Sequence, residues 1–368
     1  MLKPIRILQV FAQMNRGGAE TMIMNLYRHI DRNKVQFDFM VHTEEKCAFD
    51  DEIEQLGGKI YRIPRYTGKN HFIYKKTWRE FFIKHPEYKI IHGHVRSTAS
   101  IYLRIAKKYD LVAIAHSHNT SSGSGISSVV KNLLQFRIRN ISDYFLACSE
   151  SAGRWLFGNT IVASNRFYIL NNAIEINQFR FDDRIRDRIR KDLDIENKFV
   201  IGHVGRFHPQ KNHSLLIDIF KYVHSKKEDS VLLLVGDGDL KKMIKEKVRE
   251  ENLEDSVIFA GIRSDVPDIF KGMDLFLFPS LYEGLGIVIV EAQASGLNCI
   301  ISDKIPREAI ITTLVDKVSL SSKPEIWGEK ILEKSRYKRE DTTEAIKSAG
   351  YDIKGTTKWL EEFYMGLI

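Results

Sequence analysis

The stretch DLFLFPSLYEGLGIVIVEAQASG, residues 274–296, carries the pattern that decides the fold. It begins with an apolar run typical of a buried strand, continues through a glycine-bearing loop, and ends at Gly296 after an apolar run of helical length. A strand that leads through a short loop into a helix is the repeating unit of parallel sheets. The stretch also holds two carboxylates, Glu283 and Glu291. An acid inside an apolar helix is costly unless it has a hydrogen-bond partner.

Strand and helix patterns alternate along the whole chain, in two series. This alternation predicts an α/β protein with two doubly wound, Rossmann-like domains, because it is typical of βαβ units. We expect the domains at residues 1–175 and 176–354, with a linker near 174–182. The final segment, 355–368, has apolar residues at helical spacing and predicts a helix that packs back on the first domain. The expected strands begin at residues 5, 37, 60, 90, 111, 144 and 168, then at 199, 231, 257, 275 and 299, and the strand signal weakens beyond 303.

The chain has 368 residues and a formal net charge of +8 that is unevenly distributed. Residues 1–175 contain 25 Lys and Arg against 15 Asp and Glu. Such an excess indicates an anionic partner for the first domain, which could be nucleic acid, a membrane surface or a phosphorylated ligand. Because the sequence has no recognised nucleic-acid-binding motif, we expect no nucleic-acid partner.

The distribution of hydrophobic residues allows a prediction of where in the cell the protein acts. No apolar run approaches the ~20 residues of a membrane helix, and the N-terminal residues lack a signal-peptide pattern, so we expect a cytoplasmic protein. Residues 69–85 interleave basic and aromatic side chains at helical spacing. This predicts either a helix lying on the anionic inner face of the plasma membrane or a helix whose aromatic residues face the domain core. Cys47, Cys148 and Cys299 are far apart and predict small buried residues, not a disulfide or zinc frame.

Ligands of open parallel sheets bind at the carboxyl ends of strands, and in the first domain two such places stand out. Gly17 and Gly18 precede a helix, where they form either an anion site at the helix N-terminus or an ordinary tight turn. His116 and His118 form an HxH pair, and residues 92–94 form another. No carboxylate or cysteine accompanies either pair at ligand spacing, so we expect hydrogen bonding and no metal.

In the second domain, Arg206 and Lys211 lie on a loop that enters a helix. They form either a clamp for a diphosphate or two solvated loop cations. Asp237 and Asp239 form a DxD pair, which can hold a metal with a nucleotide, although Asp and Gly also favour this turn for conformational reasons. The dinucleotide pattern GxGxxG and the phosphate-binding pattern GxxxxGK[ST] are both absent, which argues against nicotinamide and P-loop enzymes.

Together these motifs resemble the retaining glycosyltransferases of family 4, which have the GT-B fold of two Rossmann-like domains facing a central cleft. The resemblance rests on the order and spacing of MNRGGAETMIMNLYR, AHSHNTS, GRF with KN, GDG and the E-x7-E pattern, and it covers nearly the whole chain. In particular, the motifs look like those of bacterial exopolysaccharide, capsule and biofilm-matrix glycosyltransferases.

The resemblance implies roles for individual residues. Arg206 and Lys211 would neutralise the donor diphosphate, Glu283 would hold the hydroxyls of the transferred sugar, and Glu291 those of the ribose. His116 would line the sugar pocket, with His118 as the alternative for that role. The remaining implied positions are Gly17 and Gly18 for diphosphate or acceptor, Ile262 and Arg263 for the base, and Gly284, Leu285, Gly286, Ile287 and Val288 for the loop and helix start at the diphosphate.

The expected function is retaining transfer of a hexose from a nucleotide sugar, which we take to be a UDP-sugar, onto a polyprenyl-linked or other oligosaccharide acceptor in exopolysaccharide or capsule synthesis. The resemblance implies no cofactor and no metal, and other polysaccharide-assembly proteins as partners. Two alternatives stay open. They are a nucleotide-sugar 2-epimerase of the same fold, and a non-catalytic protein that binds nucleotide sugars.

Overall fold

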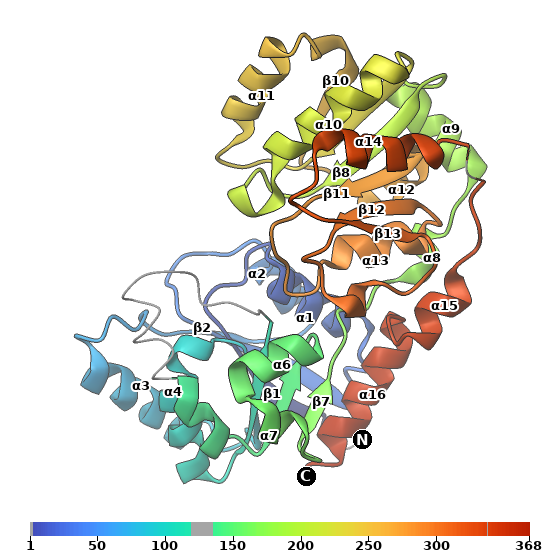
Figure 1. Cartoon of the computed structure of the whole chain (residues 1–368). Coiled ribbons are helices and arrows are strands. Elements are labelled where there is room, and N and C mark those ends of the chain that lie inside the picture. Colours follow the sequence, from blue (N-terminus) through green and yellow to red (C-terminus); the bar gives the residue numbers. More distant parts are fainter. Residues whose placement is uncertain (1–2, 119–134, 337) are drawn as a thin grey trace. The chain divides into compact units, whose positions relative to one another are not determined.

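The computed structural model describes residues 3–118, 135–336 and 338–368. The chain divides into two compact units (Figure 1). Unit 1 contains Met1–Ala173 and Asp352–Ile368, and unit 2 contains Ile174–Tyr351. The domain boundaries expected from the sequence differ from these by no more than three residues.

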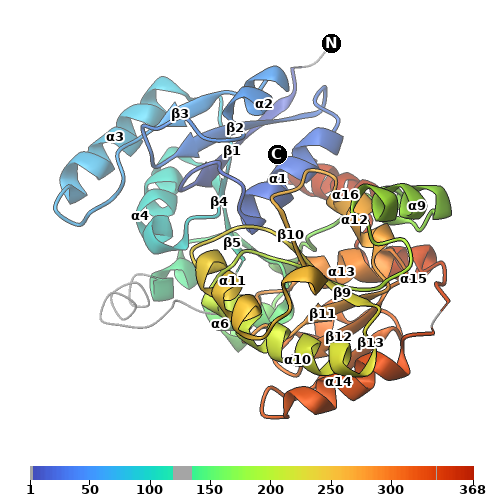
Figure 2. The same ribbon diagram turned by 90° about the horizontal axis from the view of Figure 1, so that it is seen from above.

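Unit 1 is built on a seven-stranded parallel sheet in the order β3-β2-β1-β4-β5-β6-β7, part of which can be followed in Figure 2. The chain winds outward from the centre in both directions, so its switch point lies between β1 and β4. Its strands are β1 (Ile5–Phe11), β2 (Val35–Val41), β3 (Ile60–Arg62), β4 (Ile90–Gly93), β5 (Val112–Ser117), β6 (Tyr144–Ala147) and β7 (Phe167–Ile169), and its helices are α1 (Gly18–His29), α2 (Asp50–Gln55), α3 (His71–Lys84), α4 (Arg96–Ala106), α6 (Glu150–Phe157), α7 (Asn159–Val162) and α16 (Ile353–Met365).

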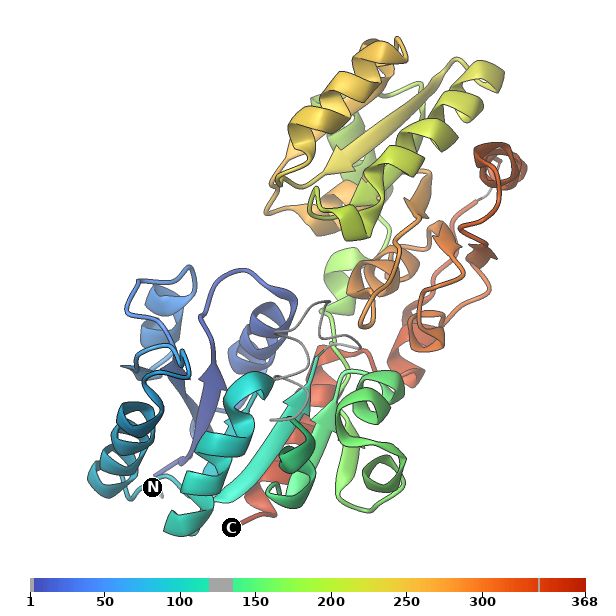
Figure 3. The same cartoon turned by 60° about the vertical axis from the view of Figure 1, so that its left-hand side comes forward.

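Alternate residues of the central strands face two different apolar layers. Ile7, Ile90 and Ile114 face a core that also contains Leu360 and Tyr364 of α16. The opposite face packs against α3 and α4. Helix α16 contacts α1 and β2, and Figure 3 shows this red helix alongside the blue and green elements of unit 1. The last described helix of the chain therefore completes the core of its first unit.

Helix α3 lies in the segment for which two predictions were made, a helix on a membrane surface or a helix whose aromatic residues face the core. Tyr74, Trp78, Phe81 and Phe82 are buried, so four of the five aromatic residues noted in this segment face the core. Phe72 is the exception, because 84% of its surface is exposed. The aromatic spacing is therefore mainly a core pattern. No helix in the described parts of the chain combines the length and apolar character needed to cross a bilayer.

Unit 2 is built on a six-stranded parallel sheet in the order β10-β9-β8-β11-β12-β13, with its switch point between β8 and β11. The edge strand β13 was not expected, because its sequence VDKV is short and half polar, as suits an edge. The strands are β8 (Phe199–Val204), β9 (Ser230–Val235), β10 (Val257–Gly261), β11 (Leu275–Phe278), β12 (Asn298–Ser302) and β13 (Val315–Val318), and the helices are α8 (Ile176–Phe179), α9 (Asp183–Asp192), α10 (His213–Lys226), α11 (Lys241–Glu250), α12 (Val266–Gly272), α13 (Ile287–Ala294), α14 (Pro324–Glu333) and α15 (Thr343–Ser348).

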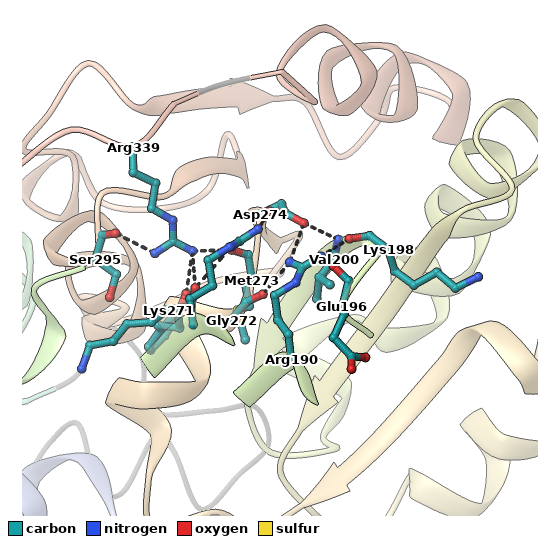
Figure 4. A network of polar contacts seen from close by, with 12 residues as sticks. Arg190, Glu196, Lys198, Val200, Lys271, Gly272, Met273, Asp274, Ser295 and Arg339 are labelled. Carbon is teal, nitrogen blue, oxygen red and sulfur yellow. Dashed lines mark hydrogen bonds and ion pairs between the residues drawn. The ribbon is translucent and has the colours of Figure 1, made fainter. Parts of the chain in front are cut away.

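A polar network holds the amino ends of β8 and β11 together (Figure 4). Asp274 accepts a hydrogen bond from the amide of Val200 at 2.7 Å and pairs with the Arg190 guanidinium at 3.1 Å. Arg339 donates to the carbonyl oxygens of Ser295, Phe270 and Lys271. These bonds satisfy carbonyl groups at the ends of α12 and α13 and fix the register of the two central strands. The network lies at the amino ends of β8 and β11, so it does not occupy their carboxyl ends, where a ligand site is expected.

Candidate active site

In unit 2, the carboxyl ends of β8 and β11 carry two loops that are bonded to each other. The Gln210 side chain donates to the Tyr282 carbonyl at 2.8 Å, and the Leu281 amide donates to the Gln210 carbonyl at 2.8 Å. Asn212 has a left-handed backbone with φ of 56° and donates its side-chain amide to Pro279. The two loops therefore form one platform at the switch point, where ligands of open parallel sheets bind.

The platform brings Lys211 and Glu283 together, although they are 72 positions apart in the chain. Lys211 Nζ lies 2.6 Å from Glu283 Oε1 and 4.6 Å from the centre of the Phe278 ring. Both side chains are largely enclosed, with exposed fractions of 17% and 8%. A charge-assisted bond in a shielded place is strong and fixes both groups. The residue expected at the diphosphate, Lys211, is thus in direct contact with the residue expected at the transferred sugar, Glu283.

Arg206 differs from Lys211 in its surroundings. Its side chain is 66% exposed and lies 3.4 Å from Asp239, which is 80% exposed. The neighbouring glycines are required by packing, since a Cβ atom at Gly236 would lie 2.2 Å from the Gly205 carbonyl oxygen. Lys241 holds the pKa of Asp237 below its usual value. The two aspartates of the DxD pair are thus engaged by cations and belong to a tight turn.

Helix α13 begins at this platform. Gly286 precedes it with a left-handed φ of 82°, and the amides of Ile287 and Val288 lie in the first turn, where backbone N–H groups have no intrahelical acceptor. Gly286 has no side chain with which to cap this end. The partial positive charge of a helix N-terminus favours an anion. Gly284 and Leu285 complete the loop, and Leu285 is buried in the core.

Glu291 lies in the second turn of α13. Burial of its carboxyl group raises the pKa of Glu291 to about 7, although the residue keeps some exposed surface. None of the hydrogen bonds or ion pairs in the described parts of the chain involves this carboxyl group. A partly accessible acid that lacks a protein partner is suited to accept hydrogen bonds from a ligand.

The expected base-binding positions follow β10. Ile262 is 74% exposed, so its side chain is accessible to a ligand. The Arg263 guanidinium is bonded to both oxygens of Asp265, at 2.8 and 2.6 Å. The Arg263 side chain is therefore already paired with Asp265. Contact with a base would use the main chain or the Ile262 side chain.

In unit 1, the carboxyl ends of β4 and β5 bring the two HxH pairs together. The His92, His94, His116 and His118 rings lie on the same face as the core residues Ile90 and Ile114, because side chains alternate along a strand. His116 and His118 stack with ring centres 4.0 Å apart, and His92 and His116 with centres 5.2 Å apart. The row of aliphatic core residues on this face is therefore followed by four histidines at the carboxyl edge of the sheet. This is the edge at which ligands of open parallel sheets bind.

These four rings are linked by hydrogen bonds. His94 Nδ1 lies 2.7 Å from His118 Nε2, and His116 Nδ1 lies 3.2 Å from His92 Nε2. Burial lowers the pKa of His92 and of His118 to about 3, and it lowers the pKa of His94 and of His116 well below the usual value. All four rings are therefore neutral at pH 7.

Three of these histidines also have the spacing of metal ligands. The ligand atoms of His92, His94 and His116 lie within 4.8 Å of one another. Neutral imidazoles suit zinc, but zinc to nitrogen bonds are about 2.0 Å, so an ion would have to replace the bonds between the rings. The positive charge of Arg96 also acts on His118 and disfavours a cation there. These residues fit hydrogen bonding better than ligation, and the expected absence of a metal stays a prediction.

Gly17 and Gly18 lie at the start of α1, as expected. Gly17 is the residue before the helix, and a Cβ atom there would lie 2.3 Å from Glu20 Oε2. Burial raises the pKa of Glu20. The carboxyl group of Glu20 thus lies over the helix start, where an anion was expected. A ligand at this end of α1 would have to displace it or bond to it.

Several residues close to these sites were not predicted from the sequence. In unit 1 they are Gln9 and Tyr364, which bond to the histidine cluster. In unit 2 they are His203 and His213, whose ring centres lie 4.9 Å apart and whose pKa values are lowered by burial and by the Lys211 charge. Each HxH pair was assessed separately as a metal site. The two pairs become neighbours only because β4 and β5 are adjacent strands of the sheet.

Two family models match the chain. Residues 16–178 match the model described as Glycosyltransferase Family 4, and residues 185–348 match the model described as Glycosyl transferases group 1. The two matches correspond to the two units and together cover most of the chain.

Relatives align over nearly the full length. EpsF of Bacillus subtilis, a protein named as a glycosyltransferase, is 37% identical over 358 residues, which cover 95% of this chain and 93% of EpsF. The capsular polysaccharide biosynthesis glycosyltransferase CapH of Staphylococcus aureus is 25% identical, covering 98% of this chain and 99% of CapH. The UDP-Gal:alpha-D-GlcNAc-diphosphoundecaprenol alpha-1,3-galactosyltransferase of Escherichia coli is 28% identical over 231 residues, covering 60% of this chain and 59% of that enzyme.

The fold is also similar to solved structures. The crystal structure of Anabaena HepE in complex with UDP superposes with a TM-score of 0.81 at 18% identity, covering 98% of this chain and 100% of that one. HepE has also been solved in complex with UDP-glucose, with a TM-score of 0.77 at 18% identity, covering 98% of this chain and 99% of that one. At this identity the likeness concerns the fold, and it confirms the expected GT-B architecture.

Proposed function

The chain belongs to the family 4 glycosyltransferases, and we propose that it transfers a hexose from a UDP-sugar, with retention of anomeric configuration, onto a lipid-linked oligosaccharide during exopolysaccharide or capsule synthesis. Family membership makes it a glycosyltransferase. The donor, the stereochemistry and the acceptor are the parts that we propose.

One observation carries the proposal. The switch point of unit 2 places Lys211, Glu283 and the start of α13 on one platform, with the unpaired carboxyl group of Glu291 one turn further along the helix. This arrangement offers positive charge for a diphosphate and two carboxylates for sugar hydroxyls. UDP as the nucleotide is supported by the name of the Escherichia coli relative and by the ligands of HepE.

The platform can stabilise charge as the bond between sugar and phosphate breaks. Negative charge develops on the leaving diphosphate, where Lys211 and the α13 amides oppose it. Arg206 is 66% exposed and would have to leave its 3.4 Å contact with Asp239 to turn toward the diphosphate. Positive charge develops at the anomeric carbon, where a carboxylate such as Glu283 is favourable. In the retaining route that we propose, the acceptor attacks the same face from which the diphosphate departs, and a phosphate oxygen takes the acceptor proton.

We propose a lipid-linked acceptor because the Escherichia coli relative is named for a diphosphoundecaprenol substrate. Association with an anionic membrane would follow from that acceptor. The exposed residues of α3 suit such a surface, since Phe72, Ile73 and Ile83 lie among Lys76, Arg79 and Lys84.

Flotation with anionic liposomes tests the membrane proposal. We expect binding at low salt that falls as salt rises, since each basic residue near the surface contributes about 1 kcal/mol. The double variant Phe72→Ser with Ile73→Ser should weaken binding, because it removes the apolar contact. The variant Met243→Ser, which changes an exposed residue of unit 2, is the control. Failure of the wild-type protein to float at low salt would rule the proposal out.

An assay of nucleoside diphosphate release tests the reaction. The protein is incubated with UDP-glucose, UDP-galactose or UDP-N-acetylglucosamine, with and without an undecaprenyl-diphosphate-linked sugar. We expect UDP release that depends on the acceptor and a product with the same anomeric configuration as the donor. A change of the donor sugar at C2 without an acceptor would instead identify a 2-epimerase, and UDP binding without turnover would identify a non-catalytic protein.

A further inference from the structure

Two buried histidines of unit 2 lie close to Lys211, and the proposed reaction gives them no role. His203 is the second-last residue of β8 and is fully buried, and His213 is the first residue of α10 and is 2% exposed. Their ring centres lie 4.9 Å apart. Burial, the His213 ring and the Lys211 charge hold the pKa of His203 well below its usual value, so this ring is neutral at pH 7.

The tautomer of His203 follows from its contact with Leu277. His203 Nδ1 lies 3.0 Å from the Leu277 carbonyl oxygen on the neighbouring strand β11, and a carbonyl oxygen can only accept. A neutral ring that donates from Nδ1 has a lone pair on Nε2. This Nε2 atom is enclosed and has no hydrogen-bond partner among the residues the structure describes. Because a buried acceptor without a donor costs stability, we expect a donor to reach it in some state of the protein.

The ammonium group of Lys211 is a donor within reach. A Cβ atom at Gly205 would lie 2.9 Å from His203 Nε2 and 3.4 Å from both Cδ and Cε of Lys211, so the two side chains border the same space beside Gly205. Lys211 Nζ is one bond beyond Cε, and rotation about the last bonds of the side chain turns it toward Nε2. An ammonium group donates three hydrogen bonds, and Glu283 takes one of them at 2.6 Å.

Glu283 and His203 affect the charge of Lys211 in different ways. The Glu283 carboxylate compensates the positive charge while it is bonded to the ammonium group, which weakens the attraction of Lys211 for a diphosphate. A neutral lone pair on His203 holds the ammonium group and leaves its charge intact. The Phe278 ring adjoins both groups, with its centre 4.6 Å from Lys211 Nζ and 5.4 Å from the centre of the His203 ring. Its face also attracts the cation without neutralising it.

We propose that His203 is a positioning residue that accepts a hydrogen bond from Lys211 when the donor sugar engages Glu283. In the free protein, Glu283 pairs with Lys211 and compensates its charge. When sugar hydroxyls occupy the carboxylate, Lys211 turns to His203 Nε2, and its uncompensated charge is held at the leaving diphosphate. The inference rests on the proposed function, because that function assigns the sugar to Glu283 and the diphosphate to Lys211.

Nuclear magnetic resonance tests the tautomer of His203. Full-length protein labelled with nitrogen-15 in histidine is observed at pH 7 by long-range proton to nitrogen correlation, and the variant His203→Phe identifies the signal by its loss. We expect the His203 proton on Nδ1 and none on Nε2. A proton on Nε2 would overturn the proposal, since this atom could then not accept from Lys211.

Removal of Glu283 tests the exchange of partners without any ligand. In the variant Glu283→Ala, Lys211 loses the carboxylate, so we expect the Nε2 signal of His203 to move to lower frequency, as it does when a ring nitrogen accepts a hydrogen bond. Glu291→Gln is the control for this signal, because it changes an acid of the same platform and keeps the contact between Lys211 and Glu283. An unmoved Nε2 signal in folded Glu283→Ala would overturn the proposal.

Titration with nucleotide sugars separates the inference from the proposed function. UDP-glucose, UDP-galactose and UDP-N-acetylglucosamine are added in turn, and binding is followed by calorimetry. A UDP-sugar that binds should move the His203 Nε2 signal in the same direction as Glu283→Ala does. Binding without this movement would overturn the role of His203 and leave the proposed function standing. Binding of none of the three would count against the proposed function, while the Glu283→Ala result would still decide whether Lys211 turns to His203.

Kinetics show whether His203 acts through Lys211. The variant His203→Phe keeps a ring against Phe276 and Phe278 but removes the acceptor, and we expect kcat to fall about tenfold with little change in UDP affinity. In a Lys211→Ala background the same change should cost nothing further, because residues that act as one unit are not additive. His224→Phe, which replaces a half-buried histidine of α10, is the matched control and should leave kcat unchanged. Equal losses from His203→Phe in both backgrounds would overturn the positioning role.

Discussion

The raised pKa of the buried Glu291 carboxyl group makes the stability of the protein depend on pH. Its pKa of about 7 in the folded protein lies above the value of 4.5 for an unhindered carboxyl group. The unfolded chain therefore releases this proton first as pH rises, and the free energy of unfolding decreases between about pH 4.5 and pH 7 before it levels off. Burial causes this cost, and we expect a ligand to be the partner that offsets it.

The variant Glu291→Gln should remove this dependence. We expect its free energy of unfolding to exceed that of the wild type by about 2 kcal/mol above pH 8, a value reduced for partial exposure, and by little at pH 5. Urea denaturation at pH 5, 6.5 and 8 measures the difference. A difference that does not grow with pH would show that the carboxyl group is solvated or already paired.

The two carboxylates should differ in kinetics. Glu283→Gln should lower kcat, because a group beside the developing positive charge acts mainly in the transition state. Glu291→Gln should mainly raise the donor KM, because the ribose changes little during the reaction. Steady-state kinetics with binding of free UDP measures both. If Glu283→Gln abolished UDP binding, its role would be to hold Lys211 and the loop, as their 2.6 Å contact also allows.

At the scale of elements, the start of α13 depends on the left-handed backbone of Gly286. Gly286→Ala should destabilise the protein by about 1–2 kcal/mol and weaken UDP binding, since the new Cβ atom would lie 3.1 Å from Ile289 and the first-turn amides would shift. Gly68→Ala is the matched control, because Gly68 has φ of 83° and open space around it. Thermal denaturation and UDP titration of both variants test this. Equal UDP affinity would show that the amides do not bind the diphosphate.

The sequence predicted the elements well where their pattern was strong. Strand β11 is apolar throughout and β1 is apolar at five of its seven residues, so residues 5–11 and 275–278 could be recognised from their own sequence. The edge strand β13 was missed, because two of its four residues are charged and edge strands lack a buried face on both sides. The aromatic residues of α3 could be assigned to the core only once the sheet beneath them was known.

Site residues could be predicted from the sequence only where they lie in a local motif. Glu283, Glu291 and Lys211 were predicted as site residues because each lies in a local motif. The histidine cluster was not, because His94 and His116 become neighbours only through the pairing of β4 with β5. Tyr364 could not be placed at all, since it comes from α16, more than 240 residues further along the chain than His116. Contacts of this kind depend on topology and leave no signal in local sequence.

At the scale of the whole molecule, the distribution of charge predicts a reaction without metal. We expect Lys211 and the α13 amides to oppose the diphosphate charge, and Asp237 is already engaged by Lys241. We expect turnover to persist in excess EDTA, measured as UDP release. Loss of turnover that Mg²⁺ or Mn²⁺ restores would assign a metal to the aspartates. Lys211→Ala should cost about 2–4 kcal/mol of transition-state stabilisation in either case.

Unit 1 is discontinuous in sequence, and this has a consequence for biosynthesis. Its core needs Leu360 and Tyr364, which follow the whole of unit 2 in the chain. A ribosome that adds about 5–20 residues per second makes α16 roughly 10–40 s after the last strand of the unit 1 sheet. During this delay the apolar groove that receives α16 is open to water and to other chains. We therefore expect nascent unit 1 to be a client of chaperones, and unit 2 to reach its native state first although its synthesis starts later.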